Sequence, residues 1–463
     1  SRIPARAKGI DPEGRRRTGL NIDTDEPIFA VPGHSSIYGA NGSGKSTRVA
    51  MPALLSMISA KPGKGLMALD GKDGEIAAQV AELLAELGFK VGVIDDLNTR
   101  PELAHLRVNV NPMGSIVSAW HRDPRDVMFA IDILLQALLP DPERDERNQY
   151  FRDWPKKIIE FAIWVLLNRA PELVTPGGIA TILADQDMLT SMAKIEAEEG
   201  DAVVRGLAQA ILGMQGHEHW PQHLERAQKA LRLFGPQTRL AEVGKDADVT
   251  HEQLIREGWV GFVVGPQRFM TAMGTYFALH LLAFCDALYQ NIGALRVIAD
   301  EWTNCPVKPL VSALTTLRAY GGELTMISQS PSEVIRKFGE REAQTIEDNS
   351  ITKQWLGFSN FQEAEKISRA MGEEHAVASS LSGESGGLKT NTNLSLIRQR
   401  RMSAAELMAM PRDQQLVHVK GVGFFICRTI AQNQIAPYCD LLAPNPLEGG
   451  KLPSDPKITL VTP

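Results

Sequence analysis

The stretch Gly39-Ala40-Asn41-Gly42-Ser43-Gly44-Lys45-Ser46 fits the pattern GxxxxGK[ST] of phosphate-binding loops. Its glycines allow the backbone to curl so that successive N–H groups point at phosphate oxygens. In this pattern Lys45 reaches the β- and γ-phosphates, and the hydroxyl of Ser46 binds Mg²⁺. A chance match is the alternative. The stretch predicts a nucleotide site formed by Gly39, Ala40, Asn41, Gly42, Ser43, Gly44, Lys45, Ser46 and Thr47.

The flanking sequence places this loop between a strand and a helix. Residues 34–38 favour a β-strand, and residues 47–58 show the apolar spacing of a helix, which Pro52 is expected to kink or delay. A strand, a helix and a second strand are then expected at Gly65–Asp70, Ala77–Leu87 and Lys90–Asp95. This order is typical of a βαβ unit, so the sequence predicts an α/β fold with a mainly parallel sheet flanked by helices.

An apolar strand that ends in two acids is the second signal. It reads Arg296-Val297-Ile298-Ala299-Asp300-Glu301. Next to a phosphate-binding loop, the carboxylate of Asp300 would hold the hydration shell of Mg²⁺, and Glu301 would activate the attacking water as general base. Acids often end surface strands, so the pair alone is a weak signal. The upstream loop favours the catalytic interpretation.

Three more polar residues are candidates. Gln329 follows the predicted strand 324–328, where an amide can contact both the γ-phosphate and water; a solvated loop glutamine is the alternative. Arg318 is a candidate arginine finger, which one subunit would supply to the nucleotide site of its neighbour. The pattern alone favours an ordinary exposed arginine. Lys72 follows the strand 65–70 and would face the nucleotide or a subunit interface, or belong to a polar turn.

The middle of the chain shows the apolar spacing of helices and not of strands. Helical spacing recurs at Val127–Leu139, Trp154–Leu167, Ile179–Lys194 and Ala202–Met214. We predict an all-α insertion domain over 115–240, within a P-loop nucleotide-binding domain that comprises 22–114 and 241–443.

Three segments are expected to lack regular structure. Residues 1–21 are polar and basic and are predicted to form an arm or linker. Residues 379–392 are rich in Ser, Gly and Thr, which predicts a flexible loop, and the Pro-rich residues 444–463 are predicted to form an irregular tail.

The composition is ordinary for a globular protein. The 463 residues include 49 basic and 55 acidic ones, so the formal charge is 49 − 55 = −6, and 43% of the residues are hydrophobic. These values exclude a disordered, a fibrous and a histone-like chain, and any contact with nucleic acid must come from a local patch. The four cysteines have no CxxC spacing, which favours a reducing, cytoplasmic environment. No run of about 18 apolar residues predicts a membrane span.

The order of these motifs resembles the coupling proteins of type IV secretion systems, of the TraG/TraD kind. GANGSGKS is followed by MPALL at 51–55, similar to the family's IPxLL, and LDGKDGE at 69–75 is similar to its LDPKGE. In that stretch Gly71 replaces the proline and Asp73 is added. NP at 111–112 resembles the family's FNP step before its all-α domain, and VIADE, LRAYGG and ISQS follow in the family's order.

The resemblance implies a P-loop NTPase of the RecA/FtsK-like kind that hydrolyses ATP with Mg²⁺. It implies that Gln329 senses the γ-phosphate and that Arg318 acts in trans within a hexamer. It also implies that the protein recruits single-stranded DNA with its relaxase, or an effector protein, and drives it into a secretion channel. Family members usually carry N-terminal transmembrane helices, so we expect attachment to the cytoplasmic face of the bacterial inner membrane through a segment outside this chain.

Two other functions remain open at this stage. One is an intracellular DNA translocase of the FtsK/HerA-like kind on a related fold. The other is a cargo-docking platform that does not hydrolyse nucleotide, and the set of Lys45, Asp300, Glu301 and Gln329 argues against it.

Overall fold

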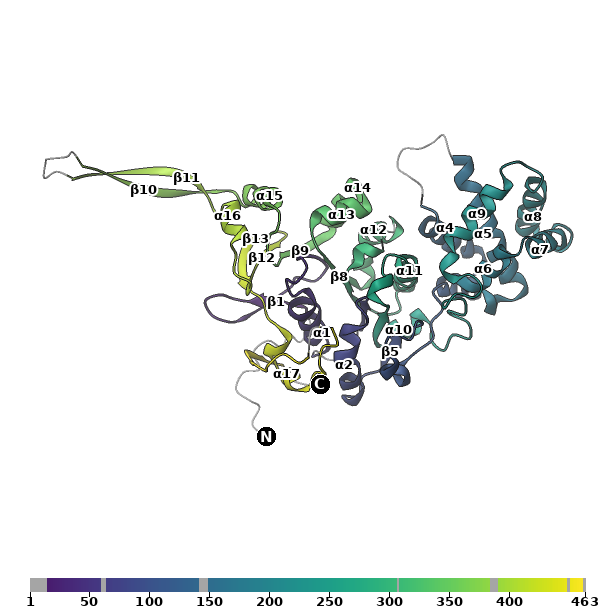
Figure 1. Cartoon of the computed structure of the whole chain (residues 1–463), viewed down its shortest axis with the longest axis horizontal. Coiled ribbons are helices and arrows are strands. Elements are labelled where there is room, and N and C mark those ends of the chain that lie inside the picture. The colour runs from purple at the N-terminus through teal and green to yellow at the C-terminus, as the bar shows by residue number, and fades with distance from the viewer. Residues whose placement is uncertain are drawn as a thin grey trace.

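The computed structural model describes residues 15–59, 64–140, 149–305, 308–383, 390–447 and 450–460. A large β-sheet lies at the centre of the molecule, a group of helices at one end, and a two-stranded ribbon projects from the other end (Figure 1). Among the described residues, no helix combines the length and the apolar character that crossing a membrane requires.

The central sheet contains eleven strands within the described residues, in the order β2-β1-β13-β12-β9-β3-β8-β7-β4-β6-β5. From β9 to β5 neighbouring strands are parallel, and from β9 to β2 they are antiparallel. The predicted mainly parallel sheet is therefore confirmed. The bounds are β1 Arg17–Leu20, β2 Pro27–Phe29, β3 His34–Tyr38, β4 Gly65–Asp70, β5 Val91–Ile94, β6 Val260–Val264, β7 Leu295–Asp300, β8 Gly322–Ser328, β9 Ser350–Trp355, β12 Gln414–Val419 and β13 Gly423–Arg428.

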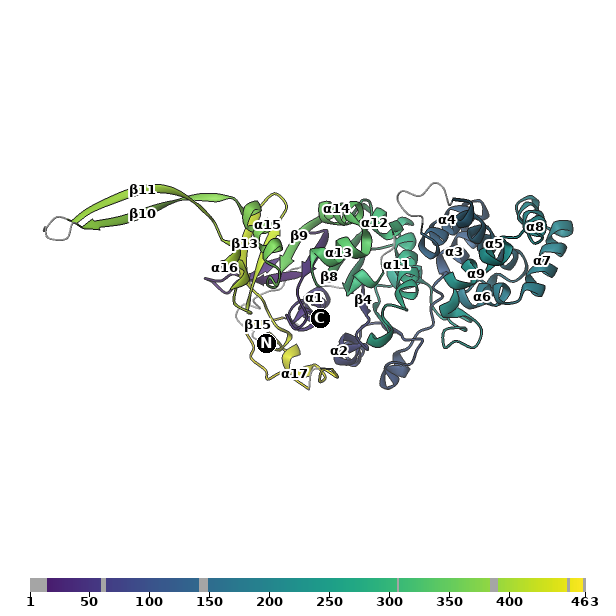
Figure 2. The ribbon, with the colours of Figure 1, turned by 45° about the horizontal axis from the view of Figure 1, so that its top comes forward.

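Helices cover both faces of the sheet (Figure 2). Successive side chains of a strand point to opposite faces, so Leu66 and Ala68 of β4 pack in one core while Met67 and Leu69 pack in the other. The first core also receives α1 Met51–Ile58 and α2 Glu75–Glu86. The second receives α11 Gly274–Tyr289, α12 Lys308–Leu314, α13 Pro331–Phe338 and α14 Glu340–Asn349.

The helical group at the end of the molecule continues the second core, which contains Phe161 and Ile211. Its α-helices are α3 Gly114–Arg122, α4 Val127–Leu138, α5 Gln149–Arg169, α6 Pro176–Ala184, α7 Gln186–Glu199, α8 Ala202–Met214 and α9 Trp220–Ala230. Elsewhere lie α10 His251–Arg256, α15 Phe361–Met371, α16 Ala404–Met408 and α17 Tyr438–Leu441.

The prediction of one helix over 179–194 is wrong. Here α6 ends at Ala184 and α7 begins at Gln186. Between them Asp185 has an extended backbone, with φ −112° and ψ 101°, and its carboxylate accepts the N–H of Met188 at 2.9 Å. A capping aspartate thus starts a new helix where the apolar spacing continues without a break.

The predicted arm at 1–21 is wrong at its end. Residues 17–20 form β1, which pairs with β2 and with β13, where Leu20 lies opposite Arg428. All four residues of β1 are buried, and Leu20 adds an apolar side chain to the core. Residues 1–14 lie outside the described residues.

The predicted flexible loop and irregular tail also need correction. Residues 379–383 and 390–392 belong to an antiparallel hairpin of β10 Glu373–Gly383 and β11 Thr390–Arg400, and 384–389 lie outside the described residues. In the tail, β15 Ile458–Thr459 pairs in parallel with β14 Ile435–Ala436. Polar residues can pair through their backbone without the apolar pattern that a sequence-based prediction needs.

Candidate nucleotide-binding site

Four neighbouring parallel strands end at the same edge of the sheet, because β3, β8, β7 and β4 lie side by side in that order. The glycine-rich loop follows β3, and Gln329 follows β8. Asp300 is the last residue of β7, and Lys72 lies in the turn after β4. The carboxyl ends of parallel strands are where ligands bind in open α/β sheets. The topology thus brings residues from distant parts of the chain to one place.

The glycine-rich loop has the backbone that phosphate binding needs. Gly42 and Gly44 have φ 76° and 84°, which side chains other than glycine rarely adopt. Residues Ser46–Ala50 form a π-helical turn, and the regular helix α1 begins at Met51. Pro52 lies in the first turn of α1, where its missing N–H costs little. The chain is helical on both sides of Pro52, so the proline does not break the helix, and the turn that precedes it is π-helical.

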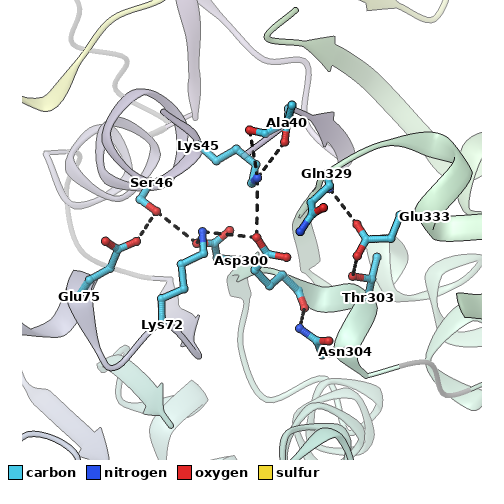
Figure 3. A network of polar contacts seen from close by, with 12 residues as sticks. Ala40, Lys45, Ser46, Lys72, Glu75, Asp300, Thr303, Asn304, Gln329 and Glu333 are labelled. Carbon is cyan, nitrogen blue, oxygen red and sulfur yellow. Dashed lines mark hydrogen bonds and ion pairs between the residues drawn. The ribbon is translucent and has the colours of Figure 1, made fainter. Parts of the chain in front are cut away.

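Lys45 points its ammonium group into the loop. Its Nζ donates a hydrogen bond to the carbonyl oxygen of Gly39 at 2.8 Å and lies 3.7 Å from Oε1 of Glu301 (Figure 3). Burial lowers the pKa of Lys45, and the nearby carboxylate of Glu301 opposes that shift. The loop lysine and the predicted general base thus face each other across the site.

Three carboxylates gather around Ser46 and Lys72. The hydroxyl of Ser46 lies 3.4 Å from Oδ2 of Asp300 and donates a short hydrogen bond to Oε1 of Glu75 (Figure 3). Nζ of Lys72 lies 3.0 Å from Oδ2 of Asp300 and 3.5 Å from Oε1 of Glu301. Burial alone would lower the pKa of Lys72, but the two carboxylates outweigh it and raise the pKa. Lys72 therefore belongs to the site.

The residues present fit a bound Mg²⁺. Oδ1 of Asp300 is buried and accepts no hydrogen bond from the described residues. Hydroxyl and carboxylate oxygens, as on Ser46 and Asp300, are the hard ligands that Mg²⁺ prefers, and phosphates and waters usually complete its shell. Within the described ranges, no cluster of three His, Cys, Asp or Glu side chains could hold a metal alone. Ser46 and Asp300 are thus suited to a metal that arrives with a nucleotide.

Two backbone features hold the turns after β7 and β8. Glu301 has φ 53°, in the left-handed region, and its carbonyl oxygen accepts a hydrogen bond from Nδ2 of Asn304 at 3.1 Å. The N–H of Gln329 donates to Oε2 of Glu333 at 3.0 Å, while the hydroxyl of Thr303 donates to Oε1 at 3.1 Å. Glu333 thereby links the two turns, and Figure 3 shows the Gln329 side chain directed away from Glu333, toward the carboxylates of the site.

Arg318 lies apart from this cluster. It is exposed, in the 3₁₀ turn Leu317–Tyr320 that precedes β8, whereas Gln329 follows β8. The strand between them has seven residues, so roughly 20 Å separates Arg318 from the site in the same chain. The structure therefore does not unite Arg318 with the other predicted site residues.

A cavity of about 700 Å³ adjoins the loop on its other side. The loop residues Ala40 to Gly44 form one wall. The remaining walls include apolar side chains together with two arginines, among them Leu356, Phe358, Met408, Met410, Arg48 and Arg412. The cavity is large enough for a base and a ribose.

Sequence reasoning missed Glu75 and Glu333. The first lies in the stretch LDGKDGE, where only the lysine was singled out, and its place at the start of α2 beside β4 was the available signal. The second is four residues beyond Gln329, and no pattern in the sequence pointed to it.

Comparison with known proteins agrees with this geometry. Residues 294–412 match the family model described as the TraM recognition site of TraD and TraG. The predicted resemblance to TraG/TraD proteins is therefore confirmed over this segment, which contains β7, Arg318 and Gln329. No protein with a curated description matches the sequence.

Solved structures share the fold. Plasmid coupling protein TrwB in complex with the non-hydrolysable ATP analogue ADPNP is 17% identical, with a TM-score of 0.63 over 92% of this chain and 90% of that chain. TrwB in complex with ADP and Mg²⁺ is 15% identical, with a TM-score of 0.60 over 90% of each chain. VirB4 of Thermoanaerobacter pseudethanolicus is 15% identical, with a TM-score of 0.51 over 93% of this chain and 99% of that chain. The predicted P-loop NTPase fold is confirmed.

Proposed function

We propose that this chain is the ATP-hydrolysing part of a type IV secretion coupling protein of the TraG/TraD kind. The observation that carries the proposal is the meeting of the loop 39–47 with Asp300 and Glu301 at one edge of the sheet, where Nζ of Lys45 lies 3.7 Å from Oε1 of Glu301. The match of residues 294–412 to TraD and TraG favours a coupling protein over an FtsK/HerA-like translocase.

The residues divide the work of hydrolysis among them. The backbone of the loop and Lys45 bind the phosphates, and the cavity beside the loop receives the base and ribose. Ser46 and Asp300 hold Mg²⁺, which when bound neutralises phosphate charge. Glu301 orients a water and accepts its proton, and Gln329 contacts the γ-phosphate and the water.

The partners follow from the same family. We propose a hexameric ring, because Arg318 reaches a nucleotide site only if a neighbouring subunit supplies it. The substrate is single-stranded DNA with its relaxase or an effector protein, delivered to the secretion channel at the cytoplasmic face of the inner membrane. The matched family description names TraM recognition, which supports a substrate-recruiting role. We further propose that residues 115–240 form a separate all-α domain that faces the cargo.

Release of phosphate from ATP by the purified protein tests the proposal, with and without single-stranded DNA. Lys45→Ala and Glu301→Gln are each expected to reduce turnover by about 10²-fold or more. Glu301→Gln should still bind ATP, because it removes only the base. Lys194→Ala, on the exposed face of α7, is the control that should keep normal turnover. Near-normal turnover in both site variants would contradict the proposal.

A further inference from the structure

The Ser46 hydroxyl lies closer to Glu75 than to Asp300. The hydroxyl is within a short hydrogen bond of Oε1 of Glu75 but 3.4 Å from Oδ2 of Asp300. A serine hydroxyl has one proton to donate and two lone pairs that accept. When the Ser46 hydroxyl points its proton at Glu75, the lone pairs of its oxygen remain free to bind a cation. Oδ1 of Asp300, which is buried and has no hydrogen-bond partner among the described residues, is also available to the cation.

The second oxygen of Glu75 is held from the far end of the chain. Nδ2 of Asn445 donates a hydrogen bond to Oε2 of Glu75 at 3.2 Å, across 370 positions of sequence. Asn445 and Glu75 are both buried, with 6% and 2% exposure. Both carboxylate oxygens of Glu75 therefore have donors, and the carboxylate is fixed in one orientation (Figure 3 shows its contact with Ser46).

The C-terminal segment that carries Asn445 is anchored on α2. The N–H of Ala443 donates to the carbonyl oxygen of Gln79 at 3.0 Å, and Nε2 of Gln432 donates to Oε1 of the same Gln79 at 2.7 Å. The N–H of Asn445 itself donates to the carbonyl oxygen of Gly450 at 3.2 Å. These bonds place the amide against the first turn of α2, where Glu75 lies.

We propose that Asn445 and Glu75 are positioning residues of the metal site, so that the C-terminal segment 443–447 completes the catalytic centre. Asn445 holds the Glu75 carboxylate in place. Glu75 then accepts the hydrogen bond of the Ser46 hydroxyl, so that the proton points away from the place where Mg²⁺ binds. Without Glu75, the Ser46 hydroxyl would point its proton toward Oδ2 of Asp300, and the Ser46 lone pairs would no longer face the place where the metal binds. This proposal rests on the proposed nucleotide site. It gives Asn445 a role there, although Asn445 belongs neither to the phosphate-binding loop nor to the strand-end motifs.

Metal binding tests this proposal separately from turnover. Mn²⁺ serves as the probe, and the electron paramagnetic resonance signal of free Mn²⁺ measures its binding in the presence of saturating ADP. Asn445→Ala and Glu75→Ala are expected to weaken Mn²⁺ binding by about 10-fold or more, while affinity for ADP without metal stays unchanged. Glu75→Gln keeps an acceptor oxygen and should recover part of the loss.

Two further variants make the result decisive. Asn445→Asp conserves size but replaces the donor with a carboxylate beside Glu75, so it should weaken Mn²⁺ binding even if Glu75→Ala fails to fold. Lys451→Ala, at an exposed position beyond the segment 443–447, should bind Mn²⁺ normally. Normal Mn²⁺ affinity in folded Asn445→Ala and Asn445→Asp would overturn the proposal. Failure of the unaltered protein to bind ADP would instead refute the proposed function itself.

Discussion

Lys72 is the residue whose replacement separates charge balance from phosphate binding. Its Nζ lies 3.0 Å from Oδ2 of Asp300 and 3.5 Å from Oε1 of Glu301. Lys72→Met removes the cation that Asp300 and Glu301 share and leaves Glu301 with Lys45 alone, 3.7 Å away, so Glu301 is held less firmly. We expect kcat to fall by about 10 to 100-fold with little change in KM for ATP. Steady-state phosphate release over a range of ATP concentrations measures both quantities.

The control for Lys72 is Lys72→Arg, which keeps the positive charge and should retain more activity than Lys72→Met. A rise in KM at constant kcat in Lys72→Met would show that the lysine binds nucleotide and does not orient Glu301. The sequence left this open, since the turn Asp70-Gly71-Lys72-Asp73 can present its lysine in several directions. The structure defines the direction of the Lys72 side chain. In its turn, Asp73 and Gly74 both lie in the left-handed region, with φ 52° and 66°.

Local patterns predicted the site residues only where each residue had a motif of its own. The loop 39–47 and the pair Asp300–Glu301 were identifiable because glycines, a lysine and strand-end acids have a fixed spacing. Asn445 could not be found in this way, because its partner Glu75 lies 370 positions away and only the folded chain brings the two together.

At the scale of single elements, β1 offers the sharpest test of packing. A Cβ added at Gly19 would collide with the carbonyl oxygen of Arg428 and lie 2.8 Å from both Sγ of Cys427 and Nε2 of Gln415. The backbone of β13 cannot give way without loss of pairing. Gly19→Ala is therefore expected to lower the free energy of unfolding by about 1–3 kcal/mol, measured by urea denaturation.

The same chemical change elsewhere should have the opposite sign. Gly206 lies inside α8, and an added Cβ would meet nothing within 4 Å. Gly206→Ala should raise stability by up to about 1 kcal/mol, because alanine loses less conformational freedom in a helix. Equal effects of the two substitutions would contradict the assignment of residues 17–20 to the sheet.

Elements with a strong apolar pattern were predicted well, and elements that depend on distant partners were not. The predicted strands at 65–70 and 296–301 correspond to β4 and β7, because buried parallel strands are largely apolar. The strand β1 and the hairpin of β10 and β11 have polar or basic sequences, and only backbone pairing defines them. Asp185 shows the reverse case, in which a single capping residue divides an unbroken apolar pattern.

At the scale of the whole molecule, the position of Arg318 determines whether one chain can complete its own site. Arg318 precedes the seven-residue β8 and Gln329 follows it, so roughly 20 Å of strand separates Arg318 from the candidate site of its own chain. If Arg318 stabilises the transferred phosphoryl group, it must therefore do so in the site of a neighbouring subunit. Arg318→Ala and Glu301→Gln should each be nearly inactive alone, although their defects lie in different halves of a shared site.

Mixing the two inactive proteins distinguishes a site formed between two subunits from a site formed by one subunit alone. In an equal mixture, about a quarter of the interfaces join an intact Glu301 to an intact Arg318 from the next subunit, if subunits assemble at random. Phosphate release should therefore reappear and be greatest near equal proportions. Lys45→Ala mixed with Glu301→Gln is the matched control, because both residues belong to the site of one chain, 3.7 Å apart, and no mixture restores them. No recovery in either mixture would contradict a role of Arg318 in the site of a neighbouring subunit, whereas recovery in the first mixture alone would establish that the site lies between subunits.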